Sequence, residues 1–207
     1  MTTVLASASP ARLSVLRAAG IDPVVLVSGV DEAVVEAANS HLGPTGTVTA
    51  LARAKADAVV PAVVGEHRDA VVIGCDSMLL RDGRLRGKPA DADQARRDWS
   101  EMSGGVGDLL TGHAVLLICD GRVVERAAGY ERTAIRFGNP TEREITAYLA
   151  TGEPLLVAGG LTIDGYGGWF VDSIDGDHSC VIGISLPLTR RLLRDVGISV
   201  VDLWRQL

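Results

Sequence analysis

The fold is decided by the stretch Val71-Val-Ile-Gly-Cys-Asp-Ser-Met-Leu-Leu-Arg-Asp-Gly-Arg-Leu-Arg-Gly-Lys-Pro89. Its β-branched opening residues favour a buried strand, which we expect to run out near Asp76. A second apolar run, Met78 to Leu80, turns at Arg81-Asp82-Gly83, which is a hairpin pattern. The stretch therefore predicts a strand and a hairpin-like unit, with an acid at one end and Lys88 at the other.

Asp76 and Lys88 are the side chains of this stretch that suggest chemistry. Coming from the two ends of a hairpin-like unit, they can face the same cleft. A carboxylate there can hold a divalent metal or take a proton from water, while a lysine neutralises a phosphate. A plain structural role also fits, because an Asp at a strand end commonly caps a turn and Gly-Lys-Pro is typical of a solvated turn. The stretch alone leaves both interpretations open.

Length and composition limit the kind of protein that the chain can form. Its 207 residues fit one domain, or one domain with two lobes, and can bury a full core. Hydrophobic residues make up 47%, yet charges interrupt every apolar run well short of a membrane span, and the N-terminus shows no signal-peptide pattern. The net charge of −6 argues against a general binder of nucleic-acid polymers, but not against a site for a single nucleotide.

The cysteines indicate the compartment. Cys75, Cys119 and Cys180 are odd in number, and each lies in or beside an apolar segment. This pattern predicts reduced core residues of a cytoplasmic protein. No Cys-x-x-Cys occurs, and His178 with Cys180 is the only close pair of zinc-ligand types, so a zinc site is not expected.

The N-terminal segment predicts a strand, a short loop and a helix. Ser9 suits an N-cap and Pro10 suits the first helical position. That structural role does not explain Ser7, nor Arg12 in the first turn, where the helix dipole disfavours a cation. Two hydroxyl groups and an arginine at a helix N-terminus can bind phosphate. The segment therefore offers Ser7, Ser9 and Arg12 as candidate phosphate ligands.

Strands and helices alternate along the rest of the chain, which predicts an α/β domain with a mixed sheet. Glu32 opens a helix, where it can serve as a simple cap, and Lys55 lies on an alanine-rich helix, where a lysine is usually on a solvated face. Further helices are predicted at 31–38, 47–60 after a loop at 43–46, 91–102, 141–150 with a capping box, and 185–197. Strands are predicted at 4–6, 23–27 and 109–118, as one or two strands over 123–137, and within the glycine-rich tract 158–176.

Together these segments resemble the Maf family of nucleoside triphosphate pyrophosphatases. The matching motifs cover nearly the whole chain in order: Leu5-Ala-Ser-Ala-Ser-Pro-Ala-Arg12, Val30-Asp31-Glu32, Leu51-Ala-Arg-Ala-Lys55-Ala56, Val72-Ile-Gly-Cys-Asp76-Ser77, Gly87-Lys88-Pro89, Met102-Ser103-Gly104, Thr111-Gly112, Tyr148-Leu-Ala-Thr-Gly152-Glu153-Pro154, Ala158-Gly159 and Ile184-Ser-Leu-Pro187. The resemblance implies one elongated α/β domain over residues 1–207, with a mixed central sheet flanked by helices and a cleft between two lobes, similar to the inosine triphosphate pyrophosphatases.

The resemblance also implies an activity. Members are cytoplasmic, often homodimeric enzymes that cleave nucleoside triphosphates, including modified ones, to a monophosphate and pyrophosphate with a divalent cation such as Mg²⁺ or Mn²⁺. Asp76 then resembles the catalytic acid, which activates water or holds the metal, and Glu32 its companion carboxylate. The triphosphate-binding groups would be Ser7, Ser9, Arg12, Lys55 and Lys88. A triphosphate carries about four negative charges, so several cations, hydroxyl groups and a metal are needed to hold it.

The chain departs from the family pattern at several positions. Ile163-Asp164-Gly165 replaces the usual Ile-Gln-Gly, Gly107 replaces a histidine, Ala11 an arginine and Val157 a lysine. None of these changes alters the proposed catalytic set. Asp164 bears on base selection, because a carboxylate only accepts hydrogen bonds whereas an amide also donates. Asp-Gly is equally a common turn pair, so a surface turn is the alternative.

A function from a different class stays open at this point. The resemblance also allows a nucleotide-binding regulator of cell division and septum formation, in which catalysis is incidental. Both functions need the same triphosphate site. Asp76 beside a set of cations favours the enzyme, with a nucleoside triphosphate as the expected partner and neither a nucleic-acid polymer nor a membrane.

Overall fold

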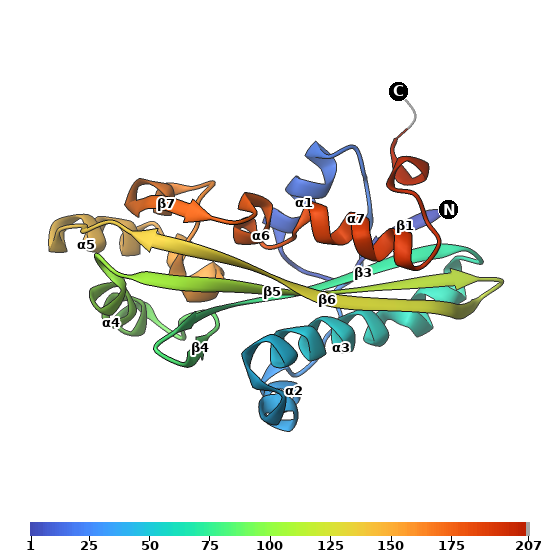
Figure 1. Ribbon diagram of the computed structural model, residues 1–207, viewed down its shortest axis with the longest axis horizontal. Helices are drawn as coiled ribbons and strands as arrows, with labels where there is room; N and C mark the ends of the chain where they lie inside the picture. The colour runs from blue at the N-terminus through green and yellow to red at the C-terminus, as the bar shows by residue number, and fades with distance from the viewer. Residues whose placement is uncertain (206–207) are drawn as a thin grey trace. The chain divides into compact units, whose positions relative to one another are not determined.

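The computed structural model describes residues 1–205 as a mixed α/β fold (Figure 1). A seven-stranded sheet has the order β2-β1-β3-β5-β6-β7, and β4 pairs with β3 beside this path. The strands are β1 (Thr2–Leu5), β2 (Val24–Val25), β3 (Ala70–Arg81), β4 (Arg84–Arg86), β5 (Val106–Cys119), β6 (Arg122–Phe137) and β7 (Val171–Asp175). The helices are α1 (Pro10–Ala18), α2 (Glu32–Asn39), α3 (Gly43–Glu66), α4 (Ala92–Met102), α5 (Glu142–Ala150), α6 (His178–Ile182) and α7 (Leu186–Asp195).

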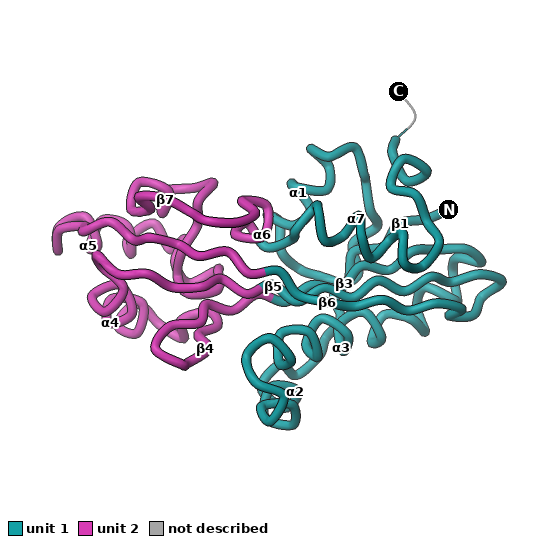
Figure 2. Tube along the Cα trace, in the orientation of Figure 1, with its two compact units in different colours: residues 1–76, 111–131, 183–207 teal, residues 77–110, 132–182 magenta. Residues whose placement is uncertain are grey.

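The predicted mixed sheet is confirmed. Strand β1 pairs in parallel with β2 and with β3, whereas β3 with β4 and β6 with β7 pair antiparallel. The chain also divides into two compact units (Figure 2). Unit 1 contains residues 1–76, 111–131 and 183–207, and unit 2 contains residues 77–110 and 132–182. Strands β3, β5 and β6 contribute residues to both units.

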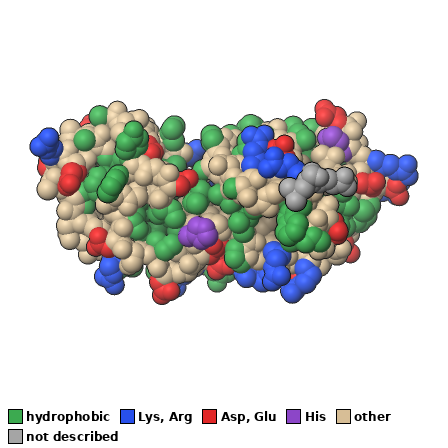
Figure 3. Space-filling model, turned by 90° about the horizontal axis from the view of Figure 1, so that it is seen from above, with side chains coloured by type: hydrophobic (Ala, Val, Ile, Leu, Met, Phe, Trp, Pro, Cys, Tyr) green, Lys and Arg blue, Asp and Glu red, His purple; other side chains and the backbone are tan. Residues whose placement is uncertain are grey.

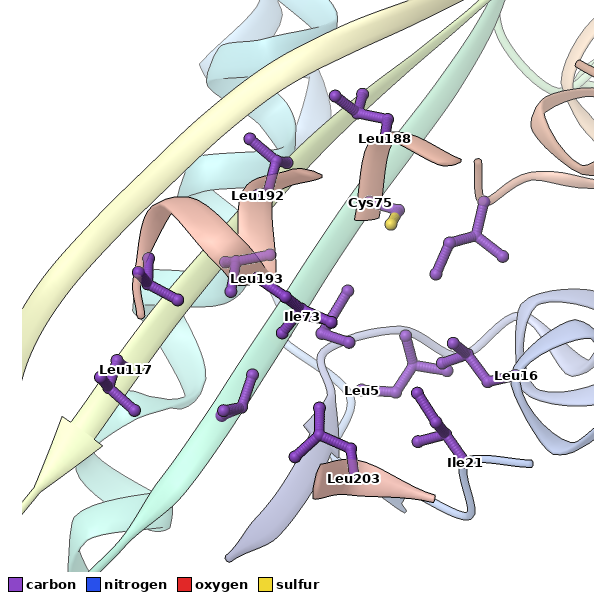
Figure 4. Close-up of a cluster of buried hydrophobic side chains, with 14 residues drawn as sticks. Leu5, Leu16, Ile21, Ile73, Cys75, Leu117, Leu188, Leu192, Leu193 and Leu203 are labelled. Atoms are coloured by element: carbon purple, nitrogen blue, oxygen red, sulfur yellow. The ribbon is translucent and has the colours of Figure 1, made fainter. Parts of the chain in front are cut away.

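The core of unit 1 lies on both faces of its part of the sheet. Because side chains alternate along a strand, Ile73 and Cys75 point to one face of β3, and Val72 points to the other. The first face packs against α1 and α7, where Leu16 and Leu188 belong to the same buried cluster (Figure 4). The second face packs against α3. Alternation thus decides which helix each residue of β3 meets.

Two glycines bring α3 close to the sheet. A Cβ atom at Gly74 of β3 would lie 2.5 Å from the carbonyl oxygen of Ala52, and a Cβ atom at Gly112 of β5 would overlap the backbone carbonyl of Val48. Only a residue without a side chain allows the backbones to approach this closely. The two glycines therefore fix how deeply α3 sits on its face of the sheet.

Unit 2 has a separate core built around one tryptophan. Trp99 of α4 meets Phe137, Tyr148 and Phe170 edge to face, with ring centroids between 5.6 and 6.0 Å away. This geometry is favoured by the charge distribution of aromatic rings. The indole Nε1 of Trp99 donates to the carbonyl of Gly160 at 2.9 Å, so its polar edge is satisfied.

Several predictions from local signals are confirmed. The turn between β3 and β4 uses Asp82 and Gly83, both with positive φ (49° and 74°), as a two-residue hairpin requires. Ser9 caps α1, and Pro10 is its first residue. Thr141 and Glu144 form the predicted capping box at the start of α5.

Three predictions about elements were wrong. Strand β3 does not end near Asp76 but continues to Arg81, because a buried cation compensates the carboxylate inside the sheet. The expected loop at 43–46 is the first turn of α3, where Pro44 and the glycine before it are tolerated, and the helix extends to Glu66. The tract 158–176 contains one strand, β7, and otherwise forms the short 3₁₀ turns η3 (Ala158–Gly160) and η4 (Tyr166–Phe170).

The distribution of surface charge and the state of the cysteines can be compared with what the sequence predicts. On the face drawn in Figure 3, basic side chains occur in separate places with acidic ones between them. All three cysteines are free; Cys75 and Cys180 are buried and Cys119 is half-buried. None of the helices within residues 1–205 is both long and apolar enough to span a bilayer.

Candidate active site

The centre of the candidate site is an ammonium group between two carboxylates. Lys55 Nζ lies 2.5 Å from Asp76 Oδ1 and 2.7 Å from Glu32 Oε1. The three side chains come from α3, β3 and the first turn of α2, and all belong to unit 1. The structure therefore brings together three of the residues that the sequence singled out.

The positions of Lys55 and Asp76 follow from the periodicity of their elements. Val48, Ala52, Lys55 and Val59 form one buried stripe of α3, so the lysine faces the sheet and is only 8% exposed. The interpretation that places it on a solvated face is wrong for this chain. Asp76 shares the α3 face of β3 with Gly74, and it is 5% exposed. The absent side chain of Gly74 leaves room for α3 directly beside the pair.

Opposing influences act on the acidity of Asp76. Burial, which disfavours the charged form, is the largest and raises the pKa of Asp76 above its ordinary value. The positive charges of Lys55 and Arg12 oppose this rise, and the negative charge of Glu32 adds to it. A carboxyl group with a raised pKa is a better proton acceptor than an ordinary Asp once it is ionised. The site therefore contains a buried carboxylate suited to act as a general base.

A second set of groups surrounds the N-terminus of α1. Arg12 Nη1 donates to Ser7 Oγ at 3.0 Å and to the carbonyl of Cys75 at 2.9 Å, next to Asp76 in the chain. Arg12 Nε donates to the carbonyl of Gly183 at 2.7 Å. Ser9 Oγ accepts from the backbone N–H of Arg12 as the helix cap. Ser7 and Arg12 are thus fixed beside β3, in the same unit as Lys55.

The donor set is compatible with a hard divalent cation. Mg²⁺ prefers oxygen ligands and is commonly held by one or two carboxylates, with water and substrate phosphates completing its shell. Asp76 and Glu32 supply two carboxylates on either side of one nitrogen atom. Within residues 1–205, no group of three or more His, Cys, Asp and Glu side chains is arranged for a metal. The protein would therefore hold such a cation through these two residues and leave positions for phosphate oxygens.

Lys88 and Asp164 belong to unit 2, and both are exposed. Lys88 follows β4, and the carbonyl of the preceding Gly87 accepts a hydrogen bond from Gly159 N at 2.8 Å. Asp164 lies on a bend whose two sides are joined by Glu153. Glu153 Oε1 accepts from Thr162 Oγ1 at 2.5 Å, and Oε2 accepts from the backbone N–H of Tyr166 at 3.1 Å. The bend that carries Asp164 is therefore held in place, and the roles of Lys88 and Asp164 stay predictions.

Three residues around these groups were not singled out from the sequence. Glu153 holds the Asp164 bend, Gly183 supplies an acceptor for Arg12, and His113 donates to and accepts from backbone groups inside unit 1. His113 had a recognisable signal, because it is a lone polar aromatic residue within the apolar strand β5. Gly183 had none, since its contribution is a backbone carbonyl.

Comparisons with a family model and with individual relatives point to the same family. A family model described as "Maf-like protein" matches residues 2–196. A nucleoside triphosphate pyrophosphatase of Saccharopolyspora erythraea is 60% identical over 205 residues, which cover 99% of this chain and 97% of the relative. Proteins of the same name from Rhodococcus opacus and Nocardia farcinica are each 57% identical, over at least 97% of this chain and 95% of their own length. The chain therefore belongs to the Maf family.

Proposed function

We propose that this protein is a nucleoside triphosphate pyrophosphatase, which hydrolyses nucleoside triphosphates to a monophosphate and pyrophosphate. The observation that carries the proposal is the buried Glu32–Lys55–Asp76 cluster, with Ser7 and Arg12 beside it in the same unit. The names of relatives that share half or more of their residues with this chain support it. A cluster of this kind supplies both a base for water and cations for phosphate.

In the proposed reaction, Asp76 accepts a proton from a water molecule, and the oxygen of that water attacks the α-phosphorus. The bond from the α-phosphorus to the bridging oxygen breaks, and that oxygen leaves as part of pyrophosphate. Lys55, Arg12 and Ser7 bind phosphate oxygens, on which negative charge increases during the attack. Lys55 then exchanges part of its present contact with Asp76 and Glu32 for the substrate, as its three N–H donors allow.

The test is pyrophosphate release from a panel of ordinary and modified nucleoside triphosphates. Asp76→Asn, which keeps the shape but removes the base, is expected to lose at least ~100-fold in turnover. The fold should survive, because Lys55 keeps Glu32 as a partner. Asp57→Asn is the matched control, since Asp57 lies on the exposed side of the same helix that carries Lys55, in an ion pair with Arg126. Near-normal turnover of a folded Asp76→Asn protein would remove Asp76 from the reaction.

We propose that a divalent cation, Mg²⁺ or Mn²⁺, is held by Asp76 and Glu32. When bound, such a cation neutralises charge on the phosphate oxygens. Glu32→Gln is expected to weaken Mn²⁺ binding, measured by electron paramagnetic resonance, whereas Glu36→Gln on the same helix should not. Chelation should stop pyrophosphate release. Equal Mn²⁺ binding by both variants would argue against Glu32 as a ligand.

We propose that Lys88 binds the triphosphate and that Asp164 contributes to base selection. An ionised carboxylate only accepts hydrogen bonds, so it favours bases that present an N–H or amino group. Asp164→Gln is expected to reorder the preference among nucleoside triphosphates, while turnover of the best substrate stays within about one order of magnitude. An unchanged ranking would mean that Asp164 only forms the turn.

The proposed setting is the cytoplasm, where a homodimer removes modified nucleotides from the nucleotide pool. Three free cysteines fit a reducing compartment. Light scattering on the purified protein measures the oligomeric state, and a mass corresponding to one chain would contradict the dimer.

A further inference from the structure

His113 is a fully buried polar residue in unit 1 that the proposed reaction does not use. On β5, the residues at 114, 116 and 118 belong to the cluster that packs against α3, and those at 115 and 117 to the cluster under α7. The alternation of side chains along a strand therefore places His113 on the α7 side. It lies at the end of that apolar cluster, under the start of α7.

The hydrogen bonds of His113 define its protonation state. The backbone N–H of Ser185 donates to Nε2 at 2.8 Å, so this nitrogen accepts and carries no hydrogen. Nδ1 lies 3.0 Å from the carbonyl oxygen of Thr111, to which it donates. The imidazole is therefore neutral, with its hydrogen on Nδ1. Its acceptor nitrogen satisfies a backbone N–H group that is buried away from water.

The turn that His113 holds also carries an acceptor for Arg12. Ser185 is the N-cap of α7, and its Oγ accepts from the N–H of Leu188 at 3.1 Å. Two residues before it, the carbonyl oxygen of Gly183 accepts from Arg12 Nε at 2.7 Å. Gly183 has a φ of 126°, a conformation that favours glycine. The turn 183–185 thus connects the imidazole on one side with the guanidinium on the other.

The direction of the Arg12 guanidinium depends on this turn. The group is planar, so fixing Nε and one terminal nitrogen fixes the whole fork. Gly183 fixes Nε, while Cys75 and Ser7 fix Nη1. Loss of the acceptor at His113 would leave the Ser185 N–H buried without that partner, and a turn that shifts to satisfy it would move the Gly183 carbonyl. Arg12 would then keep its Nη1 contacts with Ser7 and Cys75 but lose the contact that fixes Nε, so the direction of the fork would no longer be fully fixed.

We propose that His113 is a positioning residue for triphosphate binding, because its neutral imidazole fixes the turn 183–185 and, through the Gly183 carbonyl, the guanidinium of Arg12. This inference rests on the proposed function, in which Arg12 binds the triphosphate. His113 itself touches neither substrate nor reacting atoms. Its contribution is to make the orientation of Arg12 independent of whether a ligand is bound, which lowers the cost of ordering on binding.

Two substitutions that differ by one methylene group separate this role from general core packing. In His113→Gln the amide oxygen can take the place of Nε2 and accept from Ser185. In His113→Asn the shorter amide reaches only the place of Nδ1. Calorimetric titration with inorganic tripolyphosphate is expected to show binding within about threefold of the unchanged protein for Gln, and roughly tenfold weaker binding for Asn. If His113 only supplied a polar side chain to the core, the Gln and Asn variants would bind tripolyphosphate equally well.

Two controls complete the experiment. Val115→Ala removes buried side-chain atoms from the same face of β5 and should lower thermal stability without changing tripolyphosphate binding. In an Arg12→Ala background the difference between Gln and Asn should disappear, because the effect passes through Arg12. Equal binding of Gln and Asn, a difference that persists without Arg12, or no tripolyphosphate binding by the unchanged protein would overturn the inference. If the Asn variant does not fold, a Gln variant that binds more than tenfold weaker overturns it, and one that binds normally supports it.

The inference and the proposed function can fail separately. A protein that releases no pyrophosphate from any nucleotide, yet shows the Gln–Asn difference in tripolyphosphate binding, would contradict the proposed function alone. An active enzyme whose Gln and Asn variants bind tripolyphosphate equally would contradict the inference about His113 alone.

Discussion

At the scale of single residues, the site depends on a carboxylate that is buried and yet surrounded by charge. Burial raises the pKa of Asp76, and Lys55 at 2.5 Å limits the rise. The negative charge of ionised Asp76 compensates the buried ammonium group of Lys55, and the positive charge of Lys55 favours the ionised form of Asp76. Glu32 has a different position, because its side chain is 59% exposed and reaches Lys55 from the surface. The two carboxylates on the same lysine therefore differ in their contact with water.

The raised pKa of Asp76 predicts how activity depends on pH. Asp76 must be ionised to accept a proton, so activity falls when the pH falls through its pKa. Because that pKa is raised, the loss is expected above the ordinary value of 3.8. Removing the opposing cation with Lys55→Met should move the titration to still higher pH. The measurement is a ¹³C titration of the Asp76 carboxyl group, together with the acid limb of kcat/KM; a midpoint at or below 3.8 would contradict it.

The same shift has a consequence for stability. A carboxyl group with a higher pKa in the folded state binds protons more tightly there, so its contribution to stability is present at low pH and is lost as the pH rises through the folded pKa. Wherever Asp76 is ionised, its desolvation is therefore a cost to folding, which the positive charge of Lys55 partly offsets.

At the scale of elements, the contact between α3 and the sheet decides where Lys55 lies. Gly74 and Gly112 let the helix backbone approach β3 and β5. A larger distance between α3 and the sheet would move the ammonium group of Lys55 away from Asp76. The position of Lys55 therefore depends here on Gly74 and Gly112, two residues that have no side chain.

Gly112→Ala is expected to destabilise the protein by about 1–3 kcal/mol, since the added methyl group would overlap the Val48 carbonyl. The displaced helix should also lower activity. Gly65→Ala is the matched control in α3, where a Cβ atom meets nothing within 4 Å; it should raise stability by roughly 0.5–1 kcal/mol. Denaturant unfolding measures both, and a Gly112→Ala protein as stable as the unchanged one would argue against the close approach.

Elements that depend on local signals were predicted well. The Ser9 cap, the Asp82-Gly83 hairpin and the Thr141–Glu144 box each rest on residues within four positions of one another. The errors arose where distant residues decide the outcome. Asp76 does not end β3 because Lys55, 21 residues away in the chain, compensates its charge. Gly43 and Pro44 begin a helix that packs against α2, although Gly and Pro together are also typical of a loop.

For the candidate site, the sequence predicted which residues take part but not the contacts between them. Glu32, Lys55 and Asp76 were named from their motifs, and the structure places them in contact. That contact could not be derived from spacing, because it depends on the pairing of β1 with β3 and on the depth of α3. The acceptor at Gly183 and the support from His113 lie 171 and 72 residues from their partners, respectively.

At the scale of the whole molecule, unit 1 carries the complete charge cluster. Residues 7, 12, 32, 55 and 76 come from five separate segments, and the parallel pairing of β1 with β3 brings the loop after β1 next to Asp76. Strand β1 ends at this point, whereas β3 continues to Arg81. Unit 2 carries Lys88 and Asp164, for which the proposal assigns triphosphate binding and base selection.

In the proposed function, this cluster directs cleavage to the bond between the α and β phosphates. Phosphorus NMR of a nucleoside triphosphate incubated with the protein tests it most directly, because each product has its own resonance. The expected first products are a nucleoside monophosphate and pyrophosphate, in equal amounts and without an intermediate diphosphate. Orthophosphate and a nucleoside diphosphate as first products would contradict it.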